Sequence, residues 1–525
     1  QHVWRLSYIK TSGSDVTTIN LREELEKIAN FRNEPSTLRK LAVRLQLLAS
    51  PSASHTALEL TAKDFEYIPE PVGCGGDVMS DGCGFIPDDM LFRLLGGGTG
   101  ALAAARHIID REGLNVKKNV TSERSLGDIV AEIDVMHTAK CLHDDGDGDM
   151  VSCAAEVLRT VAIQVRAIGP GIGIAKGMLM RKPGITKIQL PPSMLKKGKP
   201  TTAAGAGGGD RVTLIVSEVF PSRMSTTVGK LVPRSGGGGV GDSGDRGETR
   251  LPPKSFKPRE LSDMITRLWE ALDVPRVVIQ SYQHRVKKHP ASIAHVWLVG
   301  VTDPTSSLPA GHIFVTGAVG TAVVDSPELF ITRAPAINTS DGRLLPVLSQ
   351  RPAAMSQRKW DWLLQLPFGA VVFSTAGEEG DVPLASTIAD GDLDGDLYLV
   401  CWEPTILGHI KPVDSDCQQP SSPGRDDDEE PVNHSGTSTI FLAEDSEMLC
   451  NDDTWLEQVQ AHMTDPSSCF GESKHVGKLY RRMVEVQEKQ GYNHPDARAL
   501  GDAYKKSLER SKHGKAIQLP VHLHY

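Results

Sequence analysis

The residues best suited to chemistry are four aspartates at alternate positions in a short, glycine-containing segment. They are Asp390, Asp392, Asp394 and Asp396. Carboxylates crowded in this way repel one another unless a cation offsets their charge. Oxygen ligands with no His or Cys nearby favour Mg²⁺, Ca²⁺ or Mn²⁺ over zinc. Gly391 and Gly395 would allow the backbone to turn tightly enough for the carboxylates to converge on one ion.

The spacing of the four aspartates fits more than one kind of site. An EF-hand calcium loop begins similarly, but it needs a Glu at its twelfth position and a helix on each side. Counted from Asp390, the twelfth residue is Cys401, and the apolar run 397–402 favours a strand. A tight acidic loop before a strand instead suits nucleotidyl transfer, in which one metal ion activates a 3′-hydroxyl and a second stabilises pyrophosphate. The remaining alternative is a solvated acidic turn, which the apolar run disfavours.

Composition and charge limit the class of protein. Of the 525 residues, 39% are hydrophobic and 23% are charged, which is ordinary for a soluble globular protein. The net charge of −9 argues against a protein that coats nucleic acid, although it is compatible with a locally basic channel. Two basic clusters, 196–199 and 285–289, are interpreted as solvated surface.

The cysteines and the apolar runs bear on location. The eight cysteines contain no C-x-x-C pair, so they predict neither a zinc site nor a disulfide framework, and reduced thiols indicate an intracellular protein. Nucleus and cytoplasm are both open. No run approaches the roughly 18 apolar residues of a membrane span, and residues 1–10 lack the apolar region of a signal peptide. The chain begins with Gln1 rather than Met, so it could be a fragment of a longer protein.

The pattern along the chain alternates between helical and β-rich regions. Leucines at helical spacing near 38–48 predict a helix, and so does the amphipathic stretch 262–272, which Pro275 ends. Short apolar runs broken by glycine predict strands. Six segments follow: an N-terminal helical segment (1–64), a first β-rich domain (65–220) with a solvated acidic tract (143–149), a Gly-rich linker with a connecting helix (221–295), a second β-rich domain (296–405), an acidic Ser/Pro-rich insert (406–454) and a C-terminal helical region (455–525). The composition from Trp402 to about Ser435 predicts disorder.

The acidic segment resembles a known polymerase signature. Residues 392–396, followed by Tyr398, Cys401 and Trp402, are similar to the catalytic motif of eukaryotic cellular RNA-directed RNA polymerases of the RNA-silencing type. Other segments resemble parts of that family in the same order: 41–50, 79–86, 164–166 with 176–179, 192–196, 298–303 with 311–315, 332–335 with Asp341, and 509–514. The acidic motif is specific in this context, and the other segments are individually modest.

The resemblance implies a fold and an activity. The fold would be α+β, with two double-psi β-barrels at 65–220 and 296–405 that form a catalytic cleft, and with flanking and linking helices. The activity would be that of an RNA-directed RNA polymerase. Such an enzyme copies single-stranded RNA with ribonucleoside triphosphates, and its double-stranded product would serve the small-RNA silencing machinery. Asp392, Asp394 and Asp396 would be catalytic and would bind Mg²⁺, with Mn²⁺ as a substitute.

Four more residues are implied in binding nucleotide or phosphate. Lys176 and Lys196 would face the triphosphate or the nascent strand, since a lysine ammonium suits a phosphate whose charge grows during transfer. Gln164 and Arg166 would contact the RNA backbone or support the barrel. An ordinary surface position is the alternative for each lysine. Asp81 is interpreted as a turn residue outside the site.

The sequence departs from the family pattern at several positions. Residues 389–391 read Ala-Asp-Gly where the family has Ser-Gly-Gly, which adds the fourth carboxylate. Pro191 stands in place of an Arg, Asn338 stands in place of a His, and the region between the β-rich domains is short. These departures favour an alternative function, that of a catalytically decayed double-barrel protein that acts as an RNA-binding scaffold. A calcium-binding or adhesive module is a weaker alternative, because the Glu ligand is missing.

Overall fold

The computed structural model describes twelve stretches of the chain. They are 37–49, 57–71, 78–94, 160–197, 211–220, 261–289, 292–377, 382–411, 437–441, 454–465, 473–510 and 516–524. The acidic tract predicted at 143–149 and the glycine-rich part of the predicted linker lie outside these stretches.

The first sheet has eight strands and is built from the first half of the chain. Its strands are β1 (Ala57–Thr61), β2 (Phe65–Tyr67), β3 (Cys83–Ile86), β4 (Ala162–Gly169), β5 (Gly173–Arg181), β6 (Ile188–Leu190), β7 (Leu195–Lys197) and β8 (Arg211–Phe220). They lie in the order β1-β8-β4-β5-β3-β6-β2, and β7 pairs with β5. The long antiparallel pair β4–β5 lies in the middle of the sheet, so residues on these strands are held firmly by neighbours on both sides.

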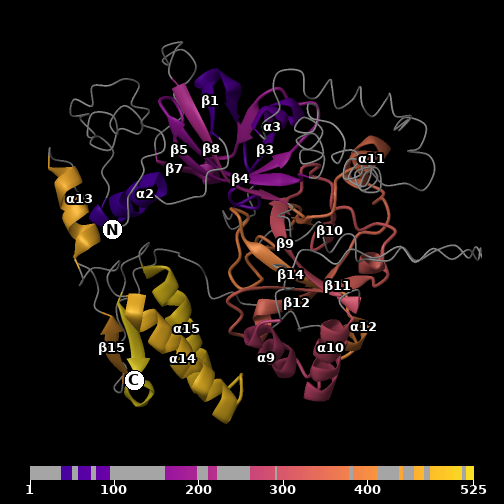
Figure 1. Cartoon of the computed structure of the whole chain (residues 1–525), viewed down its shortest axis with the longest axis vertical. Coiled ribbons are helices and arrows are strands. Elements are labelled where there is room, and N and C mark those ends of the chain that lie inside the picture. Colours follow the sequence, from indigo (N-terminus) through magenta and orange to yellow (C-terminus); the bar gives the residue numbers. More distant parts are fainter. Residues whose placement is uncertain are drawn as a thin grey trace, which may run out of the picture.

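The second sheet has six strands and lies below the first in the view of Figure 1. Its strands are β9 (His295–Thr302), β10 (Ile313–Val315), β11 (Glu328–Arg333), β12 (Gly342–Pro346), β13 (Ala370–Phe373) and β14 (Leu397–Cys401). The order is β10-β13-β9-β14-β11-β12. β14 is antiparallel to both of its neighbours, β9 and β11, so the segment that enters β14 lies at the centre of one edge of this sheet.

Two helices pack against the second sheet. They are α9 (Asp263–Ala271) and α10 (Arg276–Lys288). Ile265, Leu268 and Trp269 repeat at helical spacing, and all three are fully buried. The Trp269 ring lies 6.3 Å from that of Phe330 on β11, in an edge-to-face arrangement. The shorter helices of the described chain are α3 (Asp88–Leu94), α11 (Gln357–Leu364) and α12 (Pro404–Leu407).

The two sheets share one hydrophobic core. The largest cluster of buried residues joins Val299 and Leu399 of the second sheet to Phe85, Met178 and Met180 of the first. Because the same apolar side chains contact both sheets, the loops between the sheets have fixed positions relative to each other.

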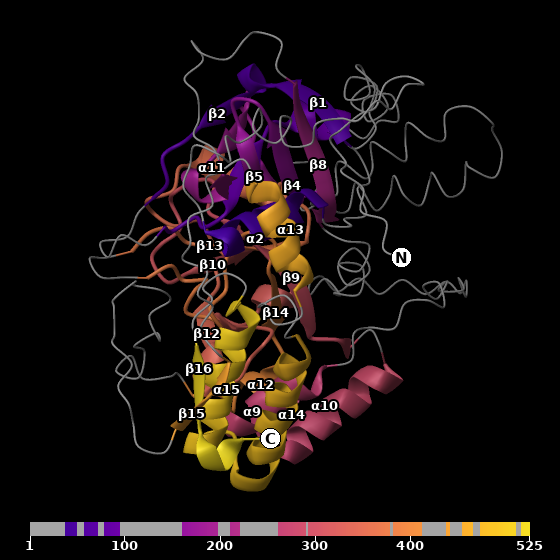
Figure 2. The same ribbon diagram turned by 90° about the vertical axis from the view of Figure 1, so that its left-hand side faces the viewer.

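The remaining helices come from the two ends of the described chain. α2 (Leu38–Ala49) and α13 (Trp455–Thr464) lie side by side in both views and share a small core with Ile168, Ile174 and Ile215 of the first sheet (Figures 1 and 2). α14 (Ser473–Gln490) and α15 (Pro495–Leu508) form an antiparallel pair covered by the two-stranded sheet β15 (Thr437–Phe441) and β16 (Ile517–Pro520).

Several predictions from the sequence can be compared directly with the structure. The mixed α+β architecture is confirmed, and α2 and α9 lie where the apolar spacing predicted helices. The disorder expected from Trp402 to about Ser435 was wrong at its start, because Pro404–Leu407 forms the helix α12, and 412–436 lies outside the described stretches. Strand β15, which pairs with β16 far along the chain, begins beyond that segment. The predicted domain boundaries stay a prediction. Among the helices that the structure describes, none has the length and apolar character needed to cross a bilayer.

Candidate active site

The four aspartates lie in a loop that we call the acid loop, residues 390–396, directly before β14. The loop folds over Tyr398, whose hydroxyl donates to the carbonyl of Asp392 (2.9 Å). Gly391 is required by this arrangement, since a Cβ there would lie 2.3 Å from the Tyr398 hydroxyl oxygen. The N–H of Gly300 on β9 donates to the carbonyl of Asp396 (3.0 Å). The acid loop is therefore fixed to the centre of the second sheet.

Each aspartate of the predicted triad has its own partner. Asp394 forms an ion pair with Lys176 (Oδ2–Nζ 2.8 Å), and Asp396 forms one with Arg333 (Oδ2–Nε 2.5 Å). Oδ1 of Asp392 accepts the backbone N–H of Asp394 (3.2 Å). In the described part of the chain, no three His, Cys, Asp or Glu side chains lie close enough together to hold a metal ion. The triad is thus brought together on one loop without converging on a single point.

The charges of the acid loop are unevenly compensated. Burial, and then the charges of Asp394 and Asp396, raise the pKa of Asp392 well above the usual value for a carboxyl group. Burial also opposes ionisation of Asp394, but Lys176 and then Lys196 outweigh it and hold the pKa of Asp394 below its usual value. Burial and the neighbouring carboxylates therefore oppose ionisation of Asp392, whereas the two lysines favour ionisation of Asp394.

The first sheet supplies the other side of the site. Gln164 on β4 donates from Nε2 to the carbonyl of Asp394 (2.9 Å), and Lys176 on β5 reaches its carboxylate. Arg166 lies on β4 opposite Lys176 in the strand pairing. Lys196, on β7, donates to the carbonyl of Ser193 (2.9 Å) and contributes to the field at Asp394. Thus Gln164 and Lys176 contact the acid loop directly, whereas Lys196 is placed near it.

A turn of the first sheet, residues 79–82, packs against the acid loop. The N–H of Leu393 donates to the carbonyl of Asp81 (3.0 Å). Gly82 approaches Asp394 so closely that a Cβ on Gly82 would lie 2.7 Å from the Asp394 Cβ. The N–H of Gly82 donates to Oγ of Ser193 (2.7 Å), whose own N–H donates to Glu70 (2.7 Å). Asp81, expected outside the site, therefore lies in a turn that contacts it.

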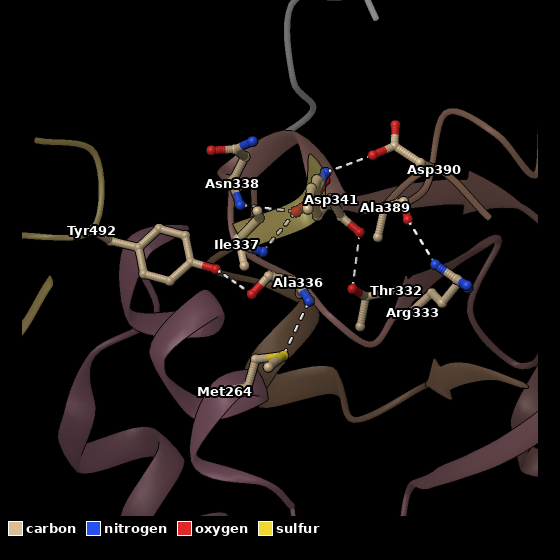
Figure 3. A network of polar contacts seen from close by, with 11 residues as sticks. Met264, Thr332, Arg333, Ala336, Ile337, Asn338, Asp341, Ala389, Asp390 and Tyr492 are labelled. Atoms are coloured by element: carbon tan, nitrogen blue, oxygen red, sulfur yellow. Dashed lines mark hydrogen bonds and ion pairs between the residues drawn. The ribbon is translucent and has the colours of Figure 1, made fainter. Parts of the chain in front are cut away.

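The fourth carboxylate points away from the triad. Asp390 forms an ion pair with Lys505 of α15 (Oδ2–Nζ 2.9 Å), and Lys505 also contacts Asp341 (3.0 Å). Burial lowers the pKa of Lys505, but Asp341 and Asp390 outweigh it and raise the pKa above its ordinary value. Arg333 donates from Nη1 to the carbonyl of Ala389 (3.0 Å), as Figure 3 shows. Asp390 is thus tied to the C-terminal helical region.

Sequence reasoning missed three residues that contact the acid loop or its entry. Arg333 was recognised only as part of the 332–335 segment, and no charge partner could be assigned to it. Lys505 gave no local signal, because basic residues in the last turn of an exposed helix are common. Asp81 looked like a turn residue, and it is one; only the three-dimensional contact reveals its neighbour.

A cavity of about 440 Å³ lies beside the acid loop. It is bordered by Trp297 of β9, by Arg333 and by Asp396. A space of this size, with an aromatic face and a charged pair on its border, is within the range of ligand pockets.

Comparisons with known proteins agree with this geometry. Residues 276–525 match the family model described as "RNA dependent RNA polymerase". Among curated proteins, none matches the sequence. The structure is similar to that of the RNA dependent RNA polymerase QDE-1 from Thielavia terrestris, with a TM-score of 0.50 and 15% sequence identity over 96% of this chain and 52% of that chain.

The chain spans about half the length of that polymerase, and the likeness is one of fold. The acid loop, Arg333 and Lys505 all lie within the segment matched by the family model, whereas Lys176 lies before it. Residues 276–525, which contain the acid loop, are therefore similar to the RNA dependent RNA polymerase family.

Proposed function

We propose that the chain carries the catalytic core of an RNA-directed RNA polymerase. The observation that best supports this is the ion pair between Lys176 of the first sheet and Asp394 of the second (2.8 Å). It brings a mobile ammonium group and a row of carboxylates together at the place where the two sheets meet. A site that transfers nucleotides needs this combination, because phosphate carries negative charge and its metal ions need oxygen ligands.

The carboxylate oxygens of the acid loop suit a hard divalent cation in their chemistry, and the three side chains would have to turn toward one point to hold it. Asp392, Asp394 and Asp396 would hold Mg²⁺, or Mn²⁺ in its place, through carboxylate oxygens. The raised pKa of Asp392, caused first by burial and then by the charges of Asp394 and Asp396, supports this assignment, because a bound cation would favour the ionised carboxylate. When bound, the metal would supply charge stabilisation for the attacking 3′-oxygen and the leaving pyrophosphate, in the two-metal manner.

The protein's own residues would position the aspartates of the acid loop and neutralise the charge of the phosphates. Arg333 holds Asp396 in place, and Gln164 fixes the backbone of Asp394. Lys176 would move from Asp394 to a phosphate oxygen when a nucleotide enters, since its flexible stem carries a point charge. Lys196 would act on the same phosphates from β7. The primer 3′-oxygen then attacks the α-phosphate, and the bond to pyrophosphate breaks.

The wider setting is also part of this proposal. The two sheets would correspond to two double-psi β-barrels, as the fold likeness to QDE-1 suggests. Single-stranded RNA would be the template and ribonucleoside triphosphates the substrates, as the family suggests. The double-stranded product would enter small-RNA silencing inside the cell.

The test is incorporation of labelled ribonucleotides on a single-stranded RNA template with Mg²⁺. Asp394→Ala should abolish incorporation and leave RNA binding largely intact. Asp361→Ala is the matched control: Asp361 accepts a hydrogen bond from Gln357 on the surface of α11, so its loss should leave the rate unchanged. Full activity in Asp394→Ala would refute the proposed site. RNA binding without any incorporation by the native chain would support the scaffold alternative instead.

A further inference from the structure

One ammonium group of the C-terminal helices reaches the segment that enters the acid loop. Nζ of Lys505 lies 2.9 Å from Oδ2 of Asp390 and 3.0 Å from Oδ1 of Asp341. The Asp341 side chain is 6% exposed, and its other oxygen accepts the N–H groups of Ile337 (2.6 Å) and Asn338 (2.8 Å). Because Asp341 is fixed in this way, it holds Lys505 in the position from which Lys505 contacts Asp390.

The helix that carries Lys505 is itself firmly placed on the turn at 336–341. Ile337 belongs to the apolar core of α14, α15 and β16, and a Cβ on Gly501 of α15 would lie 3.2 Å from it. Tyr492, in the connection between α14 and α15, donates to the carbonyl of Ala336 (2.8 Å; Figure 3). The C-terminal helical region is therefore docked on the residues that lead from β11 toward β12, with little freedom for Lys505 to shift.

The backbone before the acid loop adopts a conformation that side chains oppose. Ala389 (φ 53°) and Asp390 (φ 51°) are consecutive residues in the left-handed region, where residues other than glycine are uncommon. Such a conformation persists when surrounding contacts determine it. The N–H of Gly391 donates to the carbonyl of Ile388 (3.1 Å) and closes the turn around this pair. Two cations add contacts to it: Arg333 binds the carbonyl of Ala389, and Lys505 binds the side chain of Asp390.

We propose that Lys505 is a positioning residue that keeps the acid loop in its working geometry by compensating Asp390. This rests on the proposed polymerase function. Asp390 lies two residues before Asp392, so an uncompensated carboxylate there would add negative charge to a site already rich in it. Loss of Lys505 would also release one of the contacts that hold the left-handed pair 389–390. Lys505 touches no reacting atom and acts through Asp390.

The central test is a double-mutant cycle on the incorporation rate. Lys505→Gln keeps a donor for Asp341 but removes the charge, and it should lower kcat roughly tenfold with little change in KM for the nucleotide, because a shifted loop misplaces the reacting groups. Asp390→Gly removes the carboxylate and accepts the positive φ, so it should leave kcat near the native value. Asp390→Gly combined with Lys505→Gln should recover most of the lost rate. Lys506→Gln, on the neighbouring exposed position of α15, is the control and should be unchanged.

These outcomes separate positioning from a general structural role. If Lys505 served only to dock α15 through Asp341, Asp390→Gly would not restore the rate, and that result would overturn the proposal. Equal kcat for Lys505→Gln and Lys506→Gln would overturn it as well. Asp390→Lys covers the case in which Lys505→Gln does not fold, since it leaves the Lys505–Asp341 pair in place. It should lose at least as much rate, and a native rate would contradict the proposal.

Amide hydrogen exchange of the peptide that spans 385–397 gives a readout independent of activity. Lys505→Gln should raise exchange in this segment by roughly tenfold relative to Lys506→Gln, because local opening becomes easier. Absence of incorporation by the native chain would defeat the proposed function without deciding this inference. Unchanged exchange in Lys505→Gln would defeat this inference and leave the proposed function standing.

Discussion

Gly82→Ala tests whether the turn of the first sheet sets the position of the acid loop. The added Cβ would lie 2.7 Å from the Cβ of Asp394, and an ordinary contact begins at 3.4 Å, so the loop must move by about 0.7 Å. The positive φ of Gly82 (86°) adds a backbone cost of about 1 to 2 kcal/mol. Because a displacement near 1 Å costs up to about a hundredfold in rate, we expect incorporation to fall at least about tenfold.

Gly184→Ala separates the backbone cost from the contact. Gly184 has a similar φ (78°), and nothing lies within 4 Å of its added Cβ. Gly184→Ala should therefore lose about 1 to 2 kcal/mol in the free energy of unfolding, measured with urea, and Gly82→Ala should lose at least as much, because its Cβ also overlaps Asp394. Only Gly82→Ala should lose rate in single-turnover incorporation. Equal rates for the two variants would refute the argument that Gly82 must approach Asp394 closely.

Three further perturbations follow from the charges. Lys176→Met should lower the incorporation rate by about a hundredfold and move the acid limb of its pH profile upward, because the pKa of Asp394 is no longer held down. Arg333→Met should reduce the free energy of unfolding by roughly 2 kcal/mol in urea titrations, less than for a fully buried pair, because the Arg333 and Asp396 side chains are 22% and 21% exposed. Burial lowers the pKa of His295 from 6.5 to about 4. Between these two pH values the unfolded chain binds one more proton than the folded chain. The free energy of unfolding should therefore fall by at most about 3 kcal/mol as the pH drops from 6.5 to 4. His295→Gln should flatten that dependence in thermal denaturation, and an unchanged slope would contradict the assignment.

The sequence predicted those parts of the fold that depend on local patterns. Strand β14 lies within the apolar run 397–402 that predicted a strand, since buried strands need continuous apolar residues. α10 was not predicted, because only Ile279 and Tyr282 of its thirteen residues are buried, and the rest read as solvated surface. β15 was not predicted, because a short polar strand is stable only when it pairs with a partner, here β16.

The residues of the site likewise fall into those that the sequence predicted and those that it could not predict. The acid loop was identified from its own residues, because four carboxylates in seven positions form an unusual local pattern. Gln164 and Lys176 came from the family resemblance, and the structure places both against the loop. Arg333 and Lys505 could not be predicted, since an ion pair between residues far apart in the chain leaves no trace in local spacing. The ion pair between Asp390 and Lys505, which separates Asp390 from the other aspartates of the acid loop, likewise depends on the tertiary structure.

Sequencing the RNA made by the native chain tests the central claim most directly. The chain would be supplied with a defined single-stranded template, the four ribonucleoside triphosphates and Mg²⁺. We predict a product complementary to the template, recovered as a duplex, and absent when Asp394→Ala replaces the native chain. Untemplated addition of nucleotides, or the same complementary product from Asp394→Ala, would contradict the account.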